Sequence, residues 1–238
     1  MAPSIPPRDR PHDRLIVALD VPDAAAARAL VQRLGDAVSF YKIGLELAMS
    51  EEFFALLAWL RAQGKDVFVD LKFFDIPETV ARAVRALSRH GARFCTVHGN
   101  QAMMEAAARA KGDTLKVLAV TALTSLDRGD LDDLGFRCDV GELVLSRARR
   151  ALAAGCDGVV SSGLEVERLR REAPRELIVV TPGIRPLDNT AESDQKRVMT
   201  PARALQAGAD YLVVGRPIRD AADPRAAAQA IQREIAAV

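Results

Sequence analysis

Four side chains that can carry charge lie within nine residues of this chain, in the run Asp70-Leu71-Lys72-Phe73-Phe74-Asp75-Ile76-Pro77-Glu78. The residues just before it, 66–69, are typical of a buried strand. Because side chains two apart along a strand share a face, Asp70 and Lys72 are expected to project the same way at the strand's end. The pair indicates an electrostatic site. The alternative is a structural ion pair that seals a barrel, with Asp75 capping the next helix.

Apolar runs alternate with Ala-, Leu- and Arg-rich stretches of helical period along the chain. The runs predict strands over residues 14–19, 38–43, 66–71, 93–97, 115–120, 156–161, 177–181 and 210–214. The intervening stretches predict helices over 23–34, 51–63, 77–90, 100–111, 140–154, 164–172, 200–207 and 224–236. Eight strand–helix units predict an α/β fold, a (β/α)8 barrel, with residues 14–238 as a single catalytic domain. A doubly wound sheet would carry a glycine-rich motif in its first turn, where this chain has Asp20-Val21-Pro22-Asp23.

Composition narrows the class of protein. The chain has 238 residues, 49% of them apolar, and a net charge of +1, which gives no electrostatic case for a nucleic-acid or membrane partner. No apolar run approaches the roughly 18 residues of a membrane-spanning helix. Residues 1–13 are predicted to be a disordered leader. Three cysteines without ligand spacing fit a reduced, cytoplasmic protein, and three histidines argue against a histidine-rich metal site.

The predicted strands bring charge to one rim, and barrel enzymes place their chemistry at the carboxyl ends of the strands. These ends carry Asp20, Lys42, Asp70, Lys72, Arg185 and Arg216, and Thr124 and Ser125 follow the fifth strand. The opposite strand ends are expected to hold no comparable cluster. Lys42 is the hardest of these residues to explain structurally, because an apolar strand gains nothing from ending in an ammonium group.

The connections after the seventh and eighth strands are suited to a phosphate group. Gly215 permits close backbone approach, and Arg216 and Arg185 offer forked donors to phosphate oxygens. Residues 182–196 form a long connection containing Gln195, and loops of this length in compact domains are usually functional lids or disordered. A surface loop with solvated arginines, or a mobile loop without a role, are the alternatives.

Several residues have a structural interpretation when taken singly. Asp20 could cap the first helix, and Asp75 with Glu78 forms a capping-box-like pair before a later helix. His98 is predicted to be a hydrogen-bonded structural residue, and Ser161 a packing residue.

The sequence contains no phosphate-binding loop, dinucleotide fingerprint or metal-ligand cluster, although pyridoxal phosphate has no short signature that would exclude it. The predicted chemistry therefore uses lysine and aspartate charges and a phosphate handle, with no cofactor and no metal. Such a site could stabilise a carbanion by direct electrostatics and let a lysine deliver the proton.

The run Asp70-Leu71-Lys72-Phe73-Phe74-Asp75-Ile76-Pro77-Glu78-Thr79 closely resembles the D-x-K-x-x-D-I-P-x-T signature of the orotidine 5′-phosphate decarboxylase family, in its bacterial form. The likeness covers about residues 14–220. It includes residues 15–20, 41–44, 123–125, 181–186, 194–197 and 214–218. The D-x-K-x-x-D core is shared with related sugar-phosphate barrels, whereas its combination with D-Q-K-R and G-R-P is specific to the decarboxylases.

The resemblance implies conversion of orotidine 5′-monophosphate to uridine 5′-monophosphate and CO2 without a cofactor, in de novo pyrimidine synthesis. Asp70 would lie against the substrate carboxylate. Lys72 would stabilise the carbanion at C6 of the pyrimidine and then protonate it. Lys42 and Asp20 would complete the charge chain and hold the ribose.

The resemblance also implies a homodimer with shared active sites, because in the family the residues matching Asp75 and Thr79 reach into the partner subunit's site. The implied catalytic residues are Lys72, Asp70, Asp75 and Lys42. The implied substrate-binding residues are Asp20, Lys42, Asp70, Thr79, Thr124, Arg185, Gln195, Gly215 and Arg216.

Two positions depart from the family pattern: Phe74 stands where many members carry His, and Glu78 where many carry Asn. Neither belongs to the charge chain, so activity is expected to survive. A metal-dependent sugar-phosphate decarboxylase or aldolase of the same superfamily would need a carboxylate near the second strand, where Lys42 stands. A non-catalytic nucleotide-binding barrel should have lost part of the charge chain, which is complete here.

Overall fold

The structure, a computed structural model, describes residues 14–186 and 198–238. Within them eight parallel strands close into a barrel in sequence order, with β8 pairing back to β1. The strands are β1 (Leu15–Ala18), β2 (Phe40–Ile43), β3 (Asp66–Phe73), β4 (Phe94–His98), β5 (Lys116–Val120), β6 (Gly158–Val160), β7 (Ile178–Thr181) and β8 (Tyr211–Val214). The predicted (β/α)8 barrel is confirmed. Residues 1–13, predicted to be a leader, lie outside the described residues.

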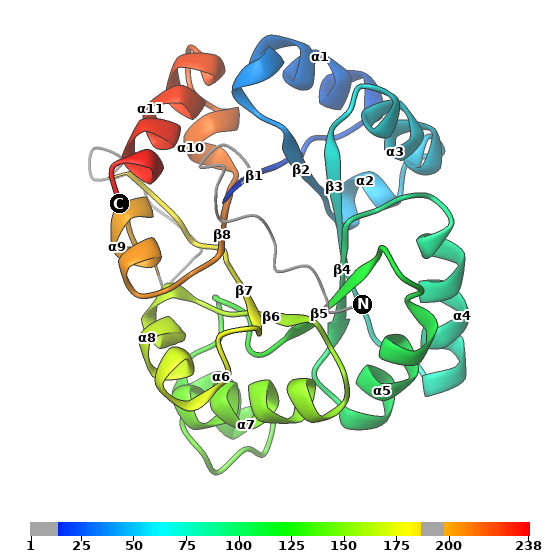
Figure 1. Ribbon diagram of the computed structural model, residues 1–238, viewed down its shortest axis with the longest axis vertical. Helices are drawn as coiled ribbons and strands as arrows, with labels where there is room; N and C mark the ends of the chain where they lie inside the picture. Colours follow the sequence, from blue (N-terminus) through cyan, green and yellow to red (C-terminus); the bar gives the residue numbers. More distant parts are fainter. Residues whose placement is uncertain (1–13, 187–197) are drawn as a thin grey trace.

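Helices form an outer ring around the strands (Figure 1). The helices that the sequence predicts are α1 (Ala24–Leu34), α3 (Phe53–Ala62), α4 (Pro77–Ser88), α5 (Gln101–Ala110), α7 (Val140–Ala153), α8 (Gly163–Glu172), α9 (Pro201–Gln206) and α11 (Pro224–Ala236). Short helices that the sequence analysis did not predict are α2 (Leu45–Ala48), α6 (Arg128–Asp133), α10 (Arg216–Arg219) and the 3₁₀ segment η2 (Gly35–Ala37).

The predicted element boundaries lie within two residues of the observed ones, and the difference at β3 is informative. This strand continues to Phe73, and its pairing with β4 shifts register between Val69 and Phe73. A shift of this kind re-aims side chains locally. It falls on the segment that carries Asp70 and Lys72.

Aromatic rings fill the interior of the barrel. The ring centroid of Phe94 lies 5.2 Å from that of Phe40 and 5.1 Å from that of Tyr211, and Phe68 belongs to the same buried cluster. Because side chains alternate along a strand, the residue two positions after each ring enters the space above it. On β2, β3 and β4 these residues are Lys42, Asp70 and Thr96. The rings therefore form a floor under three polar side chains.

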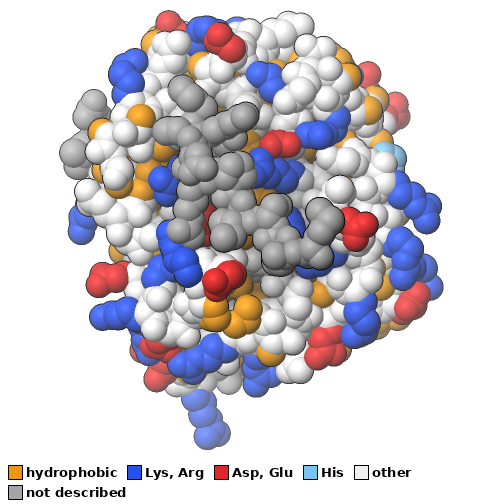
Figure 2. Space-filling model, in the orientation of Figure 1, with side chains coloured by type: hydrophobic (Ala, Val, Ile, Leu, Met, Phe, Trp, Pro, Cys, Tyr) orange, Lys and Arg blue, Asp and Glu red, His pale blue; other side chains and the backbone are white. Residues whose placement is uncertain are grey.

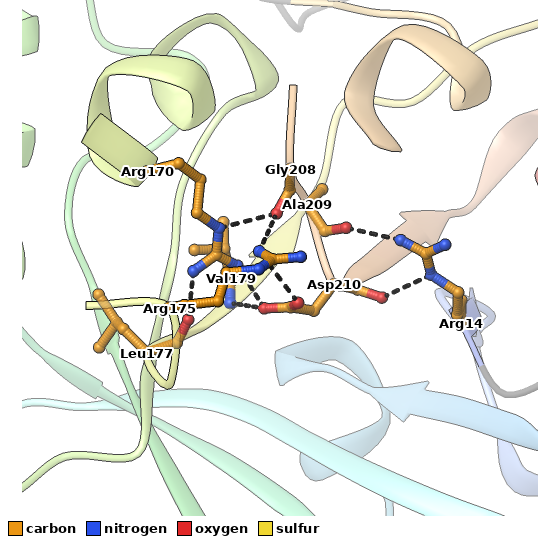
Figure 3. A network of polar contacts seen from close by, with 8 residues as sticks. All are labelled: Arg14, Arg170, Arg175, Leu177, Val179, Gly208, Ala209 and Asp210. Atoms are coloured by element: carbon orange, nitrogen blue, oxygen red, sulfur yellow. Dashed lines mark hydrogen bonds and ion pairs between the residues drawn. The ribbon is translucent and has the colours of Figure 1, made fainter. Parts of the chain in front are cut away.

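The amino ends of the strands carry a cluster of ion pairs, so the expectation of none there is wrong. Asp66 pairs with Arg93 at 2.5 Å, Asp157 with Lys111 at 2.6 Å, and Asp210 with Arg170 at 2.5 Å. Figure 3 shows Arg170 and Arg175 converging on the Asp210 carboxylate, while Arg14 reaches the backbone oxygens of Ala209 and Asp210. These contacts close the barrel at the end opposite the predicted site.

Acidic and basic side chains are interspersed over the surface. On the face shown in Figure 2, no wide area of one sign is visible among the side chains drawn there. This distribution agrees with the net charge of +1. That face offers no concentrated positive field to a polyanion.

Candidate active site

A cavity of about 360 Å³ opens at the carboxyl ends of the strands. That volume lies within the range of small-molecule sites. Of the predicted site residues, Asp20, Lys42, Asp70, Lys72, Thr124, Arg185, Gly215 and Arg216 line it. The structure therefore brings together eight residues that come from β2, β3 and the connections after β1, β5, β7 and β8.

Four charged groups form an alternating chain along one wall of this cavity. The ammonium of Lys42 lies 2.9 Å from Asp20 Oδ1 and 3.8 Å from Asp70 Oδ2. The same Asp70 oxygen lies 3.0 Å from Lys72 Nζ. The side chains of Lys42 and Asp70 are 11% and 14% exposed, whereas those of Lys72 and Asp20 are 38% and 43% exposed. The inner charges are thus poorly solvated, and the Lys72 ammonium is accessible to a ligand.

The backbone of Lys72 adopts a conformation that is uncommon for a residue with a side chain. Its φ is 49°, and it is the only non-glycine residue with positive φ among the described residues. A residue held in this region costs on the order of 1 kcal/mol or more, and such strain concentrates at functional sites. The left-handed residue coincides with the register shift between β3 and β4, and both Asp70 and Lys72 reach the cavity.

Thr96 on β4 holds this strained segment, and the sequence analysis did not single it out. The Lys72 N–H donates to Thr96 Oγ1 at 2.9 Å, and the Thr96 hydroxyl donates to Asp70 Oδ1 at 2.8 Å. Thr96 is fully buried. A threonine inside a strand is ordinary in sequence, so its type gave no signal.

The phosphate-suited connections meet at the cavity. Residues 187–197 lie outside the described residues, and with them Gln195 and most of the predicted lid. The flanks of that segment are joined, because Arg185 N–H donates to Met199 O at 2.9 Å and Met199 N–H to Gly183 O at 3.0 Å. The described residues on the two sides of residues 187–197 therefore meet beside Arg185.

Arg219 also lines the cavity and was missed. Its Nη1 donates to the backbone oxygen of Asp20 at 2.5 Å, and its Nε donates to Asp220 at 2.6 Å. The hydrogen bond from Arg219 lowers the pKa of the Asp220 carboxyl, and the same bond raises the pKa of Arg219. Arg219 lies in α10, whose four residues gave no helical pattern in the sequence.

The capping interpretations are wrong for the residues concerned. Asp23 caps α1 by accepting from the Ala26 N–H, so Asp20 is left to pair with Lys42. The N-cap of α4 is Ile76, without a side-chain cap, and Asp75 accepts from the Ile76 N–H instead.

Asp75 and Thr79 do not line the cavity of their own chain. Asp75 is exposed just before α4, and Thr79 is partly exposed in its first turn. The large apolar side chains beside Asp75, those of Phe74 and Ile76, are 64% and 66% exposed.

His98 and Ser161 are placed differently from each other. Ser161 is buried, as expected of a packing residue. The His98 ring lies 4.7 Å from that of Phe74, and its Nδ1 is buried without a hydrogen-bond partner among the described residues, contrary to the prediction. Burial, and then the nearby Arg147, lower the pKa of His98.

The acidic and cysteine side chains of the described residues do not gather into a metal site. Among residues 14–186 and 198–238, no group of three or more His, Cys, Asp or Glu side chains is placed to hold an ion. In the cavity, the Lys42 ammonium stands between the carboxylates of Asp20 and Asp70, where a cation would otherwise be drawn. The arrangement instead offers fixed charges of both signs to a ligand.

Comparison with known proteins places this geometry in a family. The profile described as "Orotidine 5'-phosphate decarboxylase / HUMPS family" matches residues 13–231. Orotidine 5'-phosphate decarboxylase of Methylococcus capsulatus is 71% identical over 223 residues, covering 94% of this chain and 92% of the relative. The enzyme of that name from Rhodopseudomonas palustris is 55% identical over 231 residues, covering 97% of each. The crystal structure of orotidine 5'-phosphate decarboxylase from Lactobacillus acidophilus matches with a TM-score of 0.82 at 36% identity, covering 94% of this chain and 99% of that one.

Proposed function

The chain belongs to the orotidine 5′-phosphate decarboxylase / HUMPS family and converts orotidine 5′-monophosphate to uridine 5′-monophosphate and CO2 in pyrimidine biosynthesis, and we propose that its alternating lysines and aspartates carry out this reaction by direct electrostatics. One observation carries the mechanism: a single oxygen of Asp70 faces both Lys72 Nζ, at 3.0 Å, and Lys42 Nζ, at 3.8 Å. A carboxylate and an accessible ammonium are thereby fixed side by side in the cavity.

The reaction breaks the bond between C6 of the pyrimidine and its carboxylate carbon. CO2 leaves, and the electron pair of that bond stays on C6. The substrate carboxylate would lie near Asp70, whose negative charge disfavours the bound carboxylate more than the transition state, in which charge has moved to C6. Asp70 cannot retreat into solvent, because its side chain is only 14% exposed.

Lys72 supplies both the opposite charge and the proton. Its ammonium stabilises the developing carbanion, then transfers a proton from Nζ to C6, and the neutral amine regains a proton from solvent. Lys42 and Asp20 keep the charged groups in place, because the Lys42 ammonium bridges the carboxylates of Asp20 and Asp70. No cofactor takes part in this scheme.

Binding energy would come from the far side of the cavity. Arg185, Arg216 and Gly215 are suited to the substrate phosphate, with Gln195 joining them from the segment outside the described residues. Thr124 would contact the pyrimidine, and Asp20 the ribose. Interactions with the remote phosphate can offset the cost of placing one carboxylate beside another.

A homodimer with shared sites would explain Asp75 and Thr79. Both lie outside their own cavity, and the exposed Phe74 and Ile76 beside Asp75 form an apolar patch of the kind that marks an interaction surface. If a second copy of the chain covered this patch, Asp75 and Thr79 of the first copy would approach the cavity of the second. They would complete the set of substrate-binding residues there.

The remaining proposals concern organisation and location. We propose that residues 14–238 form the single catalytic domain and that residues 1–13 lie outside it, which the family match beginning at residue 13 supports. No helix in the described ranges is long and apolar enough to cross a bilayer. Location in the cytoplasm is supported by Cys95, Cys138 and Cys156, which are all free thiols.

The test follows the loss of orotidine 5′-monophosphate absorbance by the purified chain in EDTA, alongside Lys72→Ala. We expect turnover by the wild type and none by the variant. Turnover of a sugar phosphate that appears only with magnesium would instead assign the chain to metal-dependent chemistry. Nucleotide binding without turnover under either condition would contradict both enzymatic assignments.

A further inference from the structure

The hydroxyl of Thr96, on the neighbouring strand β4, links two residues of the charge chain. It accepts the Lys72 N–H at 2.9 Å and donates to Asp70 Oδ1 at 2.8 Å. Thr96 is fully buried, and it is absent from the cavity lining. It therefore touches the residues that act on the substrate without touching the substrate space itself.

This hydroxyl fixes the orientation of the Asp70 carboxylate. Because Oδ1 is occupied by Thr96, the oxygen left to face the ammonium groups is Oδ2, which lies 3.0 Å from Lys72 Nζ and 3.8 Å from Lys42 Nζ. Without the Thr96 bond, the carboxylate could rotate about its Cβ–Cγ axis. Rotation would change both distances at once.

The same hydroxyl supports the left-handed backbone of Lys72. This residue has a φ of 49° at the place where the β3–β4 register shifts, and its N–H bonds to a side chain on β4. A buried N–H without a partner would carry a desolvation penalty in addition to the strain. Thr96 thus offsets part of what it costs to bring Asp70 and Lys72 to one cavity.

We propose that Thr96 is a positioning residue for the decarboxylation, acting through Asp70 Oδ1 and the Lys72 amide. The inference rests on the proposed mechanism of the same site. Its consequence is a separation of chemistry from binding. The Thr96 hydroxyl bonds to two residues of β3, whereas Arg185, Arg216 and Gly215 lie on the connections after β7 and β8. Loss of the hydroxyl should therefore lower kcat and leave nucleotide affinity in place.

The experiment compares Thr96→Val, which removes the hydroxyl at nearly constant shape, with Thr96→Ser, which keeps it. We expect Thr96→Val to lower kcat by about 10- to 100-fold, the scale associated with misplacing a reacting group by an ångström or less. KM, and the Kd for uridine 5′-monophosphate, should stay within about threefold of wild type, since the phosphate grip is intact. Thr96→Ser should keep kcat within about threefold because the hydroxyl remains.

Thr121→Val is the matched control. Thr121 is also fully buried and absent from the cavity lining, and its hydroxyl donates to Val160 O at 2.8 Å, not to a residue of the charge chain. It should lower Tm about as much as Thr96→Val does, while kcat stays near wild type. If Thr96→Val does not fold, Thr96→Ala measured against Thr96→Ser isolates the hydroxyl, and Ala should show the lower kcat.

Two results would overturn the inference. The first is a kcat for Thr96→Val within about threefold of wild type, a change too small for lost positioning. The second is a loss of kcat that follows the decrease in Tm in all three variants, Thr96→Val, Thr96→Ser and Thr121→Val. Reduced stability alone would then explain the loss of activity. Failure of the proposed mechanism is distinguishable, since it would show as unimpaired turnover by Lys72→Ala.

Discussion

The two ends of this barrel use the same residue types in opposite ways. At the amino end, Asp210 accepts the Val179 N–H at 2.8 Å as well as the Arg170 guanidinium, and Asp157 accepts the Val117 N–H at 2.9 Å as well as the Lys111 ammonium. Both of these carboxylates accept a backbone N–H and pair with a cation, and Asp66 pairs with two arginines, Arg61 and Arg93. The charges at this end therefore stabilise the fold.

At the carboxyl end the charges are left available. Asp70 accepts hydrogen bonds from the side chains of Thr96 and Lys72 and forms an ion pair with Lys42. The Lys72 side chain lines the cavity. The backbone is strained here, at Lys72. Both ends carry ion pairs, but the carboxyl end differs in having a cation, Lys72, that remains accessible to a ligand while paired.

The same substitution at the two ends should separate activity from stability, and the larger effect is at Asp70. In the proposed mechanism, Asp70→Asn removes the charge that repels the substrate carboxylate and orients Lys72. A unit charge at 4 Å is worth about 4 kcal/mol at an effective dielectric of 20, or about three orders of magnitude in rate. We expect kcat to fall by about that factor, measured by loss of substrate absorbance. Activity within tenfold of wild type would remove Asp70 from the mechanism.

Asp210→Asn is the counterpart at the amino end, and there the loss should be in stability. Removing one member of a buried pair leaves Arg170 uncompensated, which costs about 3 kcal/mol. Urea unfolding should show this decrease, while kcat per folded molecule stays near wild type. Loss of kcat with an unchanged free energy of unfolding would mean that the two ends are not separate in function.

The two ends also differ in whether a single chain supplies all of their residues. Mixing two inactive variants of the chain tests this difference. The amino-end pairs close within a chain, whereas Asp75 lies outside its own cavity. Co-expression of Lys72→Ala with Asp75→Ala should yield about half heterodimers, each with one intact shared site, and so about a quarter of wild-type activity. Lys72→Ala mixed with Asp70→Asn is the control and should recover nothing, because both changes then damage the same half-site.

Recovery of activity in that control, or no recovery in the first mixture, would contradict a shared site.

The exposed apolar patch beside Asp75 can be tested separately. If Phe74 and Ile76 are covered by a second copy, Ile76→Asp should shift the protein toward monomers in sedimentation and lower activity together with the fraction of dimer.

The carboxyl end could be predicted from sequence because strands ending in charged residues are rare and the barrel gathers them. Asp20, Lys42, Asp70 and Lys72 were found this way, and the structure brings them into one chain of contacts. Thr96 could not be found, because its role depends on the register shift between β3 and β4. One sequence does not encode that shift in any local pattern.

The amino end was missed although a sequence signal existed. The pattern A-L-x-A-G-x-D occurs at residues 151–157 and again at 204–210. In both copies the aspartate donates its own N–H to a residue on the neighbouring strand and accepts that residue's N–H on its carboxylate: Val117 for Asp157, Val179 for Asp210. The glycine has positive φ in each, 82° at Gly155 and 108° at Gly208, which ends the preceding helix. The repeated turn therefore marks the two places where an aspartate at the amino end ties one strand to its neighbour.

The smallest predicted effect concerns Cys156, a buried group whose ionisation is suppressed by burial. The amino-end carboxylates, in contrast, keep their charge because they have partners. Unlike the amino-end carboxylates, the Cys156 thiol has no charged role, and burial raises its pKa from the usual 9.0 to about 12. The folded state therefore keeps a proton that the unfolded chain loses. Stability from this group is complete below pH 9 and is lost as pH rises toward 12, by up to about 1.4 kcal/mol per pH unit.

Cys156→Ala removes this group, so urea unfolding of the variant and the wild type at pH 8, 9.5 and 10.5 isolates its contribution. Burial is the main cause that raises the pKa of Cys95 and Tyr41, and this burial is present in both proteins, so its contribution cancels in the difference. The stability advantage of the wild type over Cys156→Ala should shrink as the pH rises above 9. An advantage that stays constant to pH 10.5 would show that the thiol ionises as readily in the folded barrel as in the unfolded chain. Burial alone would then not suppress charge in this core. The fixed backbone donors to Asp157 and Asp210 would then be less important for keeping those carboxylates charged.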